Sequence, residues 1–420
     1  MDKALGGVMN GSQSGARWTI VAMVFAAVML NYVDRQILAL LKPTLELQFK
    51  WSDGDYANML SAFQVAAAVA FLGTGWFIDR VGLRLGFALG VGIWSLAGIA
   101  HAFAATVGGF IGARVVLGAA ESVGTPAAVK SAATYFTQKE RSIALGIGNT
   151  APNVGAIITP LIIPAVAVAF GWEAAFLLAG GLGLVWVAIW FMIKVPAVAE
   201  DGVKPAPIRW LDLLRRRETA AIAIGKLLSD QVWFFMLAWL PDLFHRMFGL
   251  PQGTVGLPVA LAYTMAAMGA LSGGWLPTRM MARGWTVNRA RKTTLLIYAL
   301  LILPVTLVMW TTNAWAAALL LGLGLFAHQG FSTNLFGVAT DVVPARAVGS
   351  TIGIAAFCGN LWSIVLIQLA AISLSHGWGY GPLLAICSVS YLIALGFIQL
   401  LIPVIRTVDD DGSGAIAMAH

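Results

Sequence analysis

The sequence predicts an all-α integral membrane protein with twelve transmembrane helices arranged as two pseudo-symmetric six-helix bundles. Three observations lead to this prediction. Hydrophobic residues make up 59% of the chain and charged residues only 11%, whereas a globular domain carries about 25% charged residues. Apolar stretches long enough to cross a bilayer recur from end to end. A single long polar stretch divides them into two equal sets.

Each apolar stretch has the length of a helix of about 20 residues that crosses a bilayer. In the first half these stretches cover residues 18–39, 56–78, 85–104, 108–132, 143–168 and 174–193. In the second half they cover residues 219–243, 257–277, 293–311, 314–338, 348–373 and 382–404. The residues before Arg17 are polar and rich in glycine, and a full-length span follows them. We therefore expect a short tail there rather than a cleaved signal peptide.

The polar stretch between the sixth and seventh spans contains three prolines and the run Arg215-Arg216-Arg217. We expect a tail at 1–17, a bundle at 18–195, a linker at 196–217, a bundle at 218–406 and a tail at 407–420. Weak echoes between the halves support a duplicated origin. Gly75-Trp76 follows the second span, and Gly274-Trp275 follows the eighth. Internal repeats of this kind, with a site between the halves at the midplane, are typical of secondary transporters.

The net charge of +7 reflects membrane topology rather than a binding surface. Of the 26 Lys and Arg residues, 19 fall in segments on the side of the N-terminus. On the opposite side lie only Lys42, Lys50 and Arg246. Because basic residues concentrate in cytoplasmic loops, we expect both termini to be cytoplasmic. This distribution gives no reason to expect a nucleic-acid partner.

The sequence shows no pattern of an enzyme or of a metal protein. It has no CxxC or HExxH motif, and its five histidines are scattered. Cys358 and Cys387 lie within apolar spans, so we expect small buried side chains rather than a disulfide. A membrane enzyme would need a nucleophile with a base, or a metal constellation, and none is visible. We predict no catalytic residue, no metal site and no cofactor.

Four charged residues inside predicted spans are the main candidates for function. Arg114 and Glu121 share a helix face to within about 20°, because seven residues turn a helix by about 700°. Asp34 and Arg35 lie together in the first span. A charge near the bilayer centre costs about 2.5–3.5 kcal/mol on insertion scales, so each must face a partner or a wet cavity. Such a cluster is typical of a path for ions or for an anionic solute.

Arg35 is the best candidate substrate ligand in this cluster. One acid cannot neutralise two cations in a low dielectric, so we expect a free Arg35 guanidinium that can bind a carboxylate. The structural alternative is that Asp34 pairs with Arg114 and only holds helices together. Burial and a nearby arginine act in opposite directions on the ionisation of Glu121, so we predict a proton site there. The structural alternative for Glu121 is a permanent ion pair with Arg114.

Polar residues in other spans supply the donors and acceptors that a hydroxyl-rich ligand requires. Lys226 and Asp230 share a face of the seventh span, and they either form a structural ion pair or contact the far end of a substrate. We expect Lys130 to extend to the cytoplasmic interface. For the uncharged candidates the alternative is interhelical hydrogen bonding. These are Tyr32, Gln64, Asn149, Asn153, His328, Gln329, Ser332, Asn334 and Asn360, of which Asn149, Asn153, His328 and Gln329 rank first.

The strongest local motif, Gly75-x-x-x-Asp79-Arg80-x-Gly82-x-Arg84, lies between the second and third spans. Gly82 permits a tight turn. Asp79 can approach a helix N-terminus or a basic side chain, and Arg80 and Arg84 hold the loop at the cytoplasmic face. We expect this segment to be a conformational gating loop.

This motif and Arg114-x-x-x-Gly118 together resemble the major facilitator superfamily over residues 18–406. The string Asn31-Tyr32-Val33-Asp34-Arg35, and Glu121 followed by Pro126, look like its anion:cation symporter family. Two further strings look most like bacterial hexuronate transporters. They are Lys139-Glu140-Arg141-Ser142-Ile143-Ala144 and Ala327-His328-Gln329. The chain departs from several sugar-acid carriers at Ala67, where they place a tyrosine.

The resemblance implies uptake of a sugar acid, such as glucuronate or galacturonate, with protons as the coupling ion. It implies that Arg35 binds the substrate carboxylate and that Asp34, Glu121 and Arg114 take part in proton coupling. It also implies a monomer surrounded by lipid in the bacterial cytoplasmic (inner) membrane, with a small anionic substrate as its partner. The alternatives are another organic anion (an aldonate, an aldarate or an aromatic acid), an antiport mode, or a solute-sensing membrane receptor.

Overall fold

Residues 11–136, 138–193 and 210–406 are described by the structure, a computed structural model. Most of the expected linker at 196–217, the C-terminal tail at 407–420 and residues 1–10 lie outside this range. The described chain contains twelve segments that are long and apolar enough to cross a membrane. They correspond one by one to the expected spans, so the prediction of a twelve-helix membrane protein is confirmed.

Seven helices precede the linker. They are α1 (Gly11–Phe49), α2 (Asp53–Val81), α3 (Leu83–His101), α4 (Val107–Glu121), α5 (Gly124–Tyr135), α6 (Gln138–Phe170) and α7 (Trp172–Met192). The short α8 (Trp210–Leu214) leads into the second half. That half contains α9 (Arg217–Phe248), α10 (Gly256–Ala282), α11 (Val287–Leu301), the 3-10 helix η1 (Leu303–Trp310), α12 (Ala314–Val342), α13 (Ala345–Ser375) and α14 (Gly381–Leu401).

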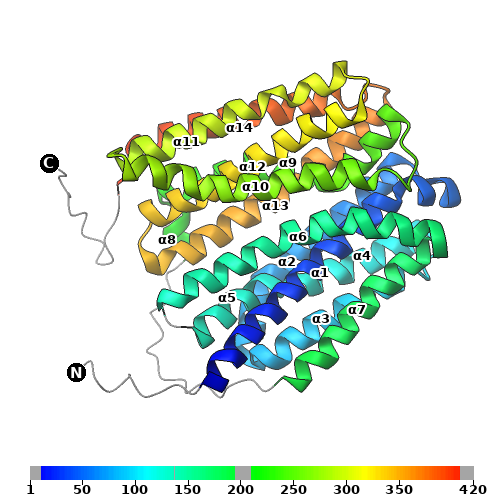
Figure 1. Cartoon of the computed structure of the whole chain (residues 1–420), viewed down its shortest axis with the longest axis horizontal. Coiled ribbons are helices and arrows are strands. Elements are labelled where there is room, and N and C mark those ends of the chain that lie inside the picture. Colours follow the sequence, from blue (N-terminus) through cyan, green and yellow to red (C-terminus); the bar gives the residue numbers. More distant parts are fainter. Residues whose placement is uncertain (1–10, 137, 194–209, 407–420) are drawn as a thin grey trace.

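The helices form two bundles that lie side by side, α1 to α7 in one and α9 to α14 in the other (Figure 1). Within the first bundle α1 packs on α6, α2 on α4 and α3 on α7, and within the second α10 packs on α12 and α9 on α13. Between the bundles, α2 packs on α13, α6 on α10 and α1 on α9. The start of α1 and the end of α14 lie at the same end of the molecule (Figure 1). We call this the terminal end and the other the distal end.

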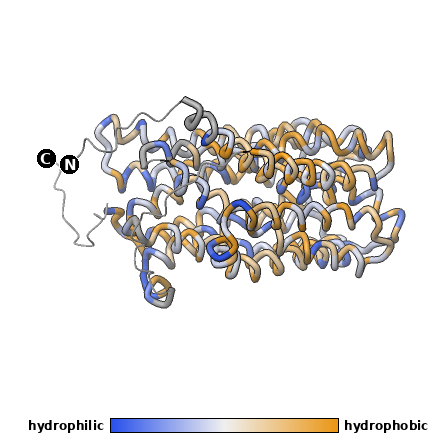
Figure 2. Tube along the Cα trace, turned by 90° about the horizontal axis from the view of Figure 1, so that it is seen from below, coloured by the Kyte–Doolittle hydropathy of each residue, from blue (hydrophilic) through white to orange (hydrophobic). Residues whose placement is uncertain are grey.

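The outer surface of the bundles is apolar, as a bilayer requires. Large hydrophobic side chains such as Trp310, Leu271 and Phe170 are more than two-thirds exposed. In Figure 2 hydrophobic residues predominate along the helices, and hydrophilic residues gather at both ends and at a few points between them. A polar interior with an apolar exterior is the arrangement in which buried charges of a membrane protein are tolerated.

Two helices differ from the expected spans for clear physical reasons. The first helix runs to Phe49 rather than ending near residue 39, because Leu40, Leu41 and Leu45 are buried against neighbouring helices. The fourth span is broken into α4 and α5 directly after Glu121. Pro126 explains the break, since its ring lacks an N–H and crowds the carbonyl four residues earlier.

Candidate functional site

An ion pair between α1 and α4 forms the centre of the site. The Arg35 Nε donates to Glu121 Oε2 at 2.8 Å, and the side chain of Glu121 is fully buried. Our expectation of a free Arg35 is therefore wrong for this conformation, because Glu121 reaches it from a helix 86 residues away. The alternative Arg114–Glu121 ion pair is absent from the described part of the chain. Glu121 thus holds the predicted substrate ligand.

Arg114, the second arginine of the site, has no ion pair among the residues that the structure describes. It is 1% exposed, and its Nε and Nη2 have no hydrogen-bond partner among the described residues. The predicted alternative, an ion pair with Asp34, is also absent there; Asp34 is buried on the α3 side of α1, beside Gly98. A buried N–H group without a partner carries a desolvation penalty of about 1–3 kcal/mol, and more when charged. An anionic ligand would remove that penalty.

Both guanidinium groups contact one aromatic ring. The Cζ of Arg35 lies 5.0 Å from the centroid of the Phe63 ring, and the Cζ of Arg114 lies 5.8 Å from it. Arg35 also lies 5.2 Å from the ring of Tyr32. The negative faces of aromatic rings attract cations, most strongly where water is excluded. Phe63, which the sequence analysis did not select, therefore helps to hold two positive charges close together.

A small-residue position explains how α4 brings Arg114 into the site. Gly118, one turn after Arg114, lies against the backbone carbonyl of Phe63 in α2, so closely that a Cβ there would clash. The glycine thus lets the two helices approach, as small residues do in membrane interfaces. This contact gives the Arg114-x-x-x-Gly118 motif a structural reason.

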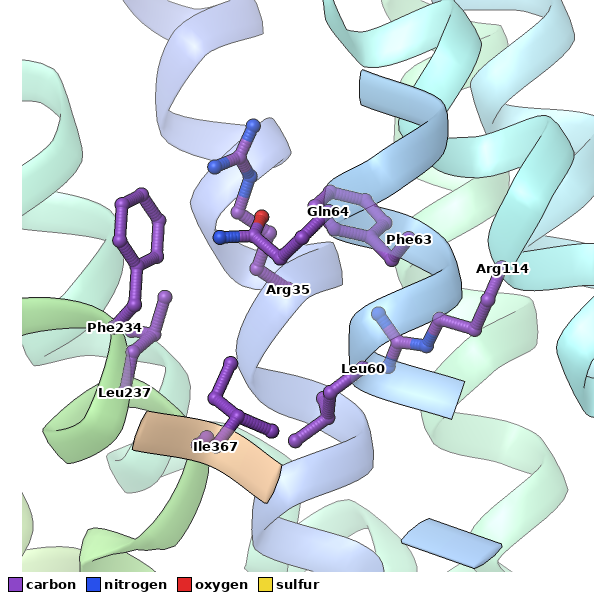
Figure 3. A pocket seen from close by; sticks show the side chains of 9 residues that line it. Arg35, Leu60, Phe63, Gln64, Arg114, Phe234, Leu237 and Ile367 are labelled. Carbon is purple, nitrogen blue, oxygen red and sulfur yellow. The ribbon is translucent and has the colours of Figure 1, made fainter. Parts of the chain in front are cut away.

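The two arginines line a cavity between the bundles (Figure 3). The empty space is about 360 Å³, part of it open to solvent. The second bundle contributes only apolar side chains to its wall. The lining residues are Arg35, Leu60, Phe63, Gln64, Arg114, Phe234, Leu237, Ala238 and Ile367. A mostly apolar cavity with a few convergent polar groups is the usual form of a small-molecule site.

Three of the predicted uncharged ligands take part in hydrogen bonds that join the bundles. The Gln64 Nε2 donates to Ser363 Oγ at 3.0 Å, and the Gln329 Nε2 donates to Asn153 Oδ1 at 3.2 Å. Each bond connects one helix of the first bundle with one of the second. The side chain of Asn149 lies outside the described part of the structure. Gln64, Asn153 and Gln329 therefore lie where a ligand between the bundles would contact both halves.

Of the remaining uncharged candidates, Asn334 bonds Arg291 of α11 within the second bundle. Tyr32 faces Trp233 of α9 with ring centroids 6.4 Å apart. His328 stacks on Trp233 at 5.5 Å and hydrogen-bonds through Nδ1 to the Tyr391 hydroxyl at 2.8 Å. Asn360 donates to the Ala356 carbonyl of its own helix. His328 and Asn360 thus have partners within the second bundle, as expected for structural hydrogen bonds.

The Lys226–Asp230 pair predicted from its spacing is present. The Lys226 Nζ lies 2.6 Å from Asp230 Oδ1 and donates to Ser332 Oγ of α12 at 3.1 Å. Asp230 packs where Gly359 of α13 leaves room, since a Cβ there would lie 2.7 Å from its Oδ2. Asp230 is four residues before Phe234, so it lies on the same face of α9 as that cavity residue. Each bundle therefore holds one buried ion pair next to the interface.

The predicted gating loop forms a tight turn at the terminal end. Gly82 ends α2 with φ +89°, a conformation that glycine adopts without strain. Asp79 pairs with the Lys130 Nζ at 2.7 Å, so Lys130 binds an acid rather than only extending to the interface. Arg84 donates to the Phe191 carbonyl at 2.7 Å at the end of α7, and Arg80 lies against the ring of Trp76. Gly75 has open space around its Cα.

The sequence analysis also missed a cluster of charges at the distal end, where α1 and α9 end. Its members are Lys42, Glu46, Asp53, Asp242, Arg246 and Tyr380. A signal for it was present, because Lys42 and Glu46, and Asp242 and Arg246, are opposite charges four residues apart. That spacing indicates a shared helix face, but it does not show that the two faces meet.

Three known proteins resemble this chain along most of its length. It is 28% identical over 400 residues to the hexuronate transporter of Escherichia coli strain K12, covering 90% of this chain and 92% of the relative. It is 26% identical to the D-galactonate transporter of Escherichia coli O6:H1, covering 94% and 97%. It is 27% identical to the galacturonate transporter of Dickeya chrysanthemi, covering 72% and 94%.

The fold also resembles solved structures. A bacterial homologue of the human lysosomal transporter Spinster, in an inward-facing and occupied conformation, matches with a TM-score of 0.75 and 18% identity. The match covers 92% of this chain and 97% of that structure. The family model described as Major Facilitator Superfamily matches residues 24–367, which include the first bundle from within α1, the second as far as α13, and every residue that lines the cavity. The protein belongs to the Major Facilitator Superfamily.

Proposed function

We propose that this protein imports a sugar acid by proton symport, with the two bundles moving around the cavity by alternating access. The observation that carries the proposal is the ion pair that buried Glu121 forms with Arg35, a residue that lines the cavity. One hydrogen bond thus connects Arg35, the proposed ligand for the substrate carboxylate, with Glu121, the proposed proton acceptor. The relatives named as hexuronate, D-galactonate and galacturonate transporters support the substrate class.

The substrate carboxylate binds to the arginines of the first bundle. Arg114 offers two nitrogens without hydrogen-bond partners, Nε and Nη2, and Arg35 offers its planar guanidinium once Glu121 releases it. A guanidinium matches a carboxylate with two parallel hydrogen bonds, which adds orientation as well as affinity. The sugar hydroxyls then replace the bonds between Gln64 and Ser363 and between Asn153 and Gln329. Substrate thereby contacts both halves.

Glu121 couples the proton to the substrate. When Glu121 is ionised it occupies Arg35, and when it is protonated it no longer holds that cation, so the carboxylate takes its place. Asp34, the buried neighbour of Arg35 on α1, is the second proton-accepting group. Importing an anion against the membrane potential costs about 2.3 kcal/mol per charge per 100 mV. One proton carried with the substrate removes this penalty, and the pH gradient supplies the driving force.

We place both termini in the cytoplasm and the protein in the bacterial cytoplasmic membrane. The support is the distribution of basic residues, 19 of 26 of which lie on the terminal side. The distal end then faces outward. At that end several polar bonds join the bundles, whereas toward the terminal end Lys130–Asp79 and Arg291–Asp341 each lie within one bundle. The conformation is therefore closed to the outside.

Uptake into proteoliposomes tests the coupling. Purified protein is reconstituted with the membrane potential clamped, and uptake of labelled glucuronate is measured with and without an inward pH gradient. We expect accumulation only with the gradient, and the same gradient collapsed by a protonophore is the control. Uptake that is indifferent to the gradient would rule out symport. Counterflow of labelled substrate distinguishes transport from sensing.

A thermal-shift screen identifies the substrate. A ligand at 100 times its Kd stabilises the folded protein by about 2.7 kcal/mol, which gives a clear rise in melting temperature. The panel compares glucuronate, galacturonate, galactonate and galactarate with neutral glucose and with an aromatic acid. A shift with a sugar acid supports the proposed class. A shift with the aromatic acid alone would contradict it.

A further inference from the structure

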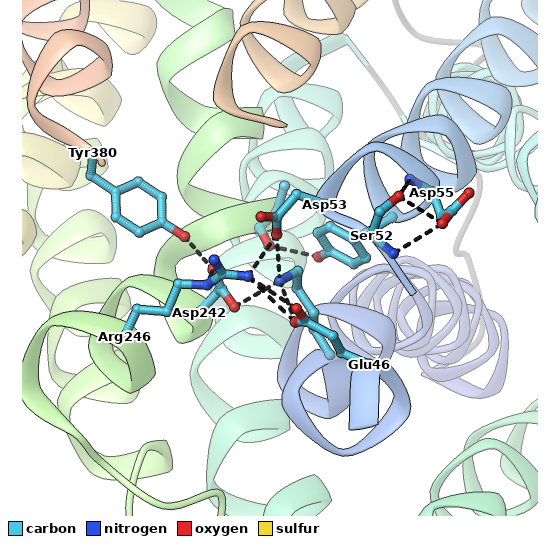
Figure 4. Close-up of polar contacts among 10 residues, drawn as sticks. Glu46, Ser52, Asp53, Asp55, Asp242, Arg246 and Tyr380 are labelled. Atoms are coloured by element: carbon cyan, nitrogen blue, oxygen red, sulfur yellow. Dashed lines mark hydrogen bonds and ion pairs between the residues drawn. The ribbon is translucent and has the colours of Figure 1, made fainter. Parts of the chain in front are cut away.

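The charge cluster at the distal end joins the two bundles (Figure 4). Lys42 and Glu46 lie near the end of α1, Asp53 begins α2, and Asp242 and Arg246 lie near the end of α9. Tyr380 precedes α14 and donates its hydroxyl to Asp242. The cluster thus draws on three helices and on the residue that precedes α14, all close to the distal end, and none of its members lines the cavity.

Each base in the cluster contacts an acid of the opposite bundle. The Lys42 Nζ lies 2.9 Å from Asp242 Oδ1, and both side chains are 1% exposed. The Arg246 Nη2 lies 2.7 Å from Asp53 Oδ1 and 3.3 Å from Glu46 Oε1. Three ion pairs therefore connect the bundles: the side chains of Arg246 and Glu46 are each 32% exposed, whereas the Lys42–Asp242 pair is buried. Breaking such a buried pair by removing one partner costs about 3–5 kcal/mol in proteins.

Aromatic and neutral contacts seal the region below the ion pairs. The Lys42 Nζ lies 5.4 Å from the ring of Tyr56 and 5.3 Å from that of Trp239, and these rings pack edge to face at 5.0 Å. The Tyr56 hydroxyl donates to the Ala238 carbonyl at 2.7 Å, which again joins the bundles. Farther in, the Gln368 Nε2 donates to Ser61 Oγ at 2.8 Å. The distal end is thus closed in successive layers.

Separation of the bundles would leave no charge in this cluster without a partner. In the first bundle, Lys42 keeps Glu46 at 2.9 Å and Asp53 at 3.0 Å. In the second, Asp242 keeps Arg246 at 2.9 Å and the Tyr380 hydroxyl. The desolvation cost of a lone buried ion therefore does not oppose opening. This arrangement fits a contact that forms and breaks repeatedly, since both of its states are satisfied.

We propose that the ion pairs from Lys42 and Arg246 to the acids of the opposite bundle are a reversible lock on the distal gate. The lock stabilises the conformation seen here, in which the distal end is closed. It must break before that end can open, so it sets the balance between the two access states. Its weakening shifts the protein toward the state that is open at the distal end.

Distances between spin labels test this lock without any substrate. Leu47 of α1 and Leu257 of α10 are 83% and 60% exposed, and they lie on opposite bundles near the distal end. Both are changed to cysteine and labelled, with Cys358 and Cys387 replaced by alanine. We expect Lys42→Met and Asp53→Asn to raise the population with long distances by about tenfold or more, because bonds to charged groups are worth at least that factor.

Asp55→Asn is the matched control. Asp55 lies two residues from Asp53, but it caps α2 by accepting hydrogen bonds from Ser52 and has no ion pair in the described structure. We expect it to leave the distances unchanged. If Lys42→Met fails to fold, Arg246→Gln serves instead, because it leaves Asp242 with Lys42 and Tyr380.

Unchanged distances in folded Lys42→Met or Arg246→Gln, and in Asp53→Asn, would overturn the lock. So would equal opening by Asp55→Asn, which would point to a general loss of helix stability. Because the measurement uses no sugar acid and no pH gradient, its failure would leave the proposed transport function standing. Conversely, a lock confirmed in a protein that transports no sugar acid would disprove only the function.

Discussion

Arg35 and Glu121 join α1 to α4 through an ion pair of 2.8 Å in which the acid is fully buried. An acid in this position controls the arginine, because the guanidinium fork cannot bind a substrate carboxylate while it donates to Glu121. In the proposed mechanism, proton binding at Glu121 and carboxylate binding at Arg35 are linked through this single ion pair. Linked sites of this kind raise each other's affinity by the same factor.

Arg35→Lys should weaken sugar-acid binding by about tenfold or more, because an ammonium keeps the charge but lacks the planar two-point fork. Isothermal titration with the sugar acid that gives the largest thermal shift measures the change. The control is Arg80→Lys, since Arg80 lies in the gating loop against the ring of Trp76. Normal affinity in folded Arg35→Lys would show that Arg35 is not the carboxylate ligand.

Glu121→Gln should keep substrate binding and exchange while it loses accumulation driven by a pH gradient. Glutamine resembles the protonated acid and leaves Arg35 available. In the unchanged protein affinity should rise as pH falls, because protonation of Glu121 releases Arg35; in Glu121→Gln this dependence should be reduced. Counterflow and gradient-driven uptake in the same proteoliposomes separate the two activities. Continued accumulation against a gradient would exclude Glu121 as the coupling residue.

Gly118→Ala should destabilise the protein by about 1–3 kcal/mol, the usual cost of inserting a methyl group into a packed contact. The added Cβ would meet the Phe63 carbonyl and push α4 away from α2. Gly112→Ala on the same helix is the control, because its Cβ would meet nothing within 4 Å. The two melting temperatures are compared in detergent. Equal melting temperatures of the two variants would mean that α4 can move away from α2 without a loss of stability.

A double-mutant cycle on Lys226 and Asp230 decides whether their pair serves structure or transport. Each single change, Lys226→Met or Asp230→Leu, strands a buried charge and should destabilise by about 3–5 kcal/mol. The double variant should regain most of that stability. If it also regains uptake, the pair is structural. If it is stable but inactive, one of the two charges acts on the substrate or on coupling.

The helical fold was predictable because apolar length alone marks a membrane span. The end of α1 was not, since Lys42, Pro43 and Glu46 give residues 40–49 the composition of a loop. Lys42 is nevertheless buried, because it pairs with Asp242 of the opposite bundle, 200 residues away in the sequence. A hydrophobic pattern predicts which residues are buried, but it does not identify the distant residue that pairs with a buried charge.

The sequence allowed us to predict which charged residues form the candidate site, but not which of them form ion pairs with each other. Asp34, Arg35, Arg114 and Glu121 stood out because a charge inside a span needs a reason. Helix geometry related Arg114 to Glu121 within one helix, yet Glu121 pairs with Arg35 from another. Phe63 gave no signal, because one more aromatic residue in an apolar span is unremarkable until two cations are seen against its ring.

The length of α1 has a mechanical consequence. Arg35 and Lys42 lie on this one helix, and seven residues place them about 10 Å apart along its axis on nearly the same face. One continuous helix therefore carries both the proposed substrate ligand, Arg35, and a residue of the proposed lock, Lys42. A turn of this helix that brings Arg35 toward a carboxylate also swings Lys42 relative to Asp242. Substrate binding at Arg35 would therefore change the position of Lys42 at the distal end directly through α1.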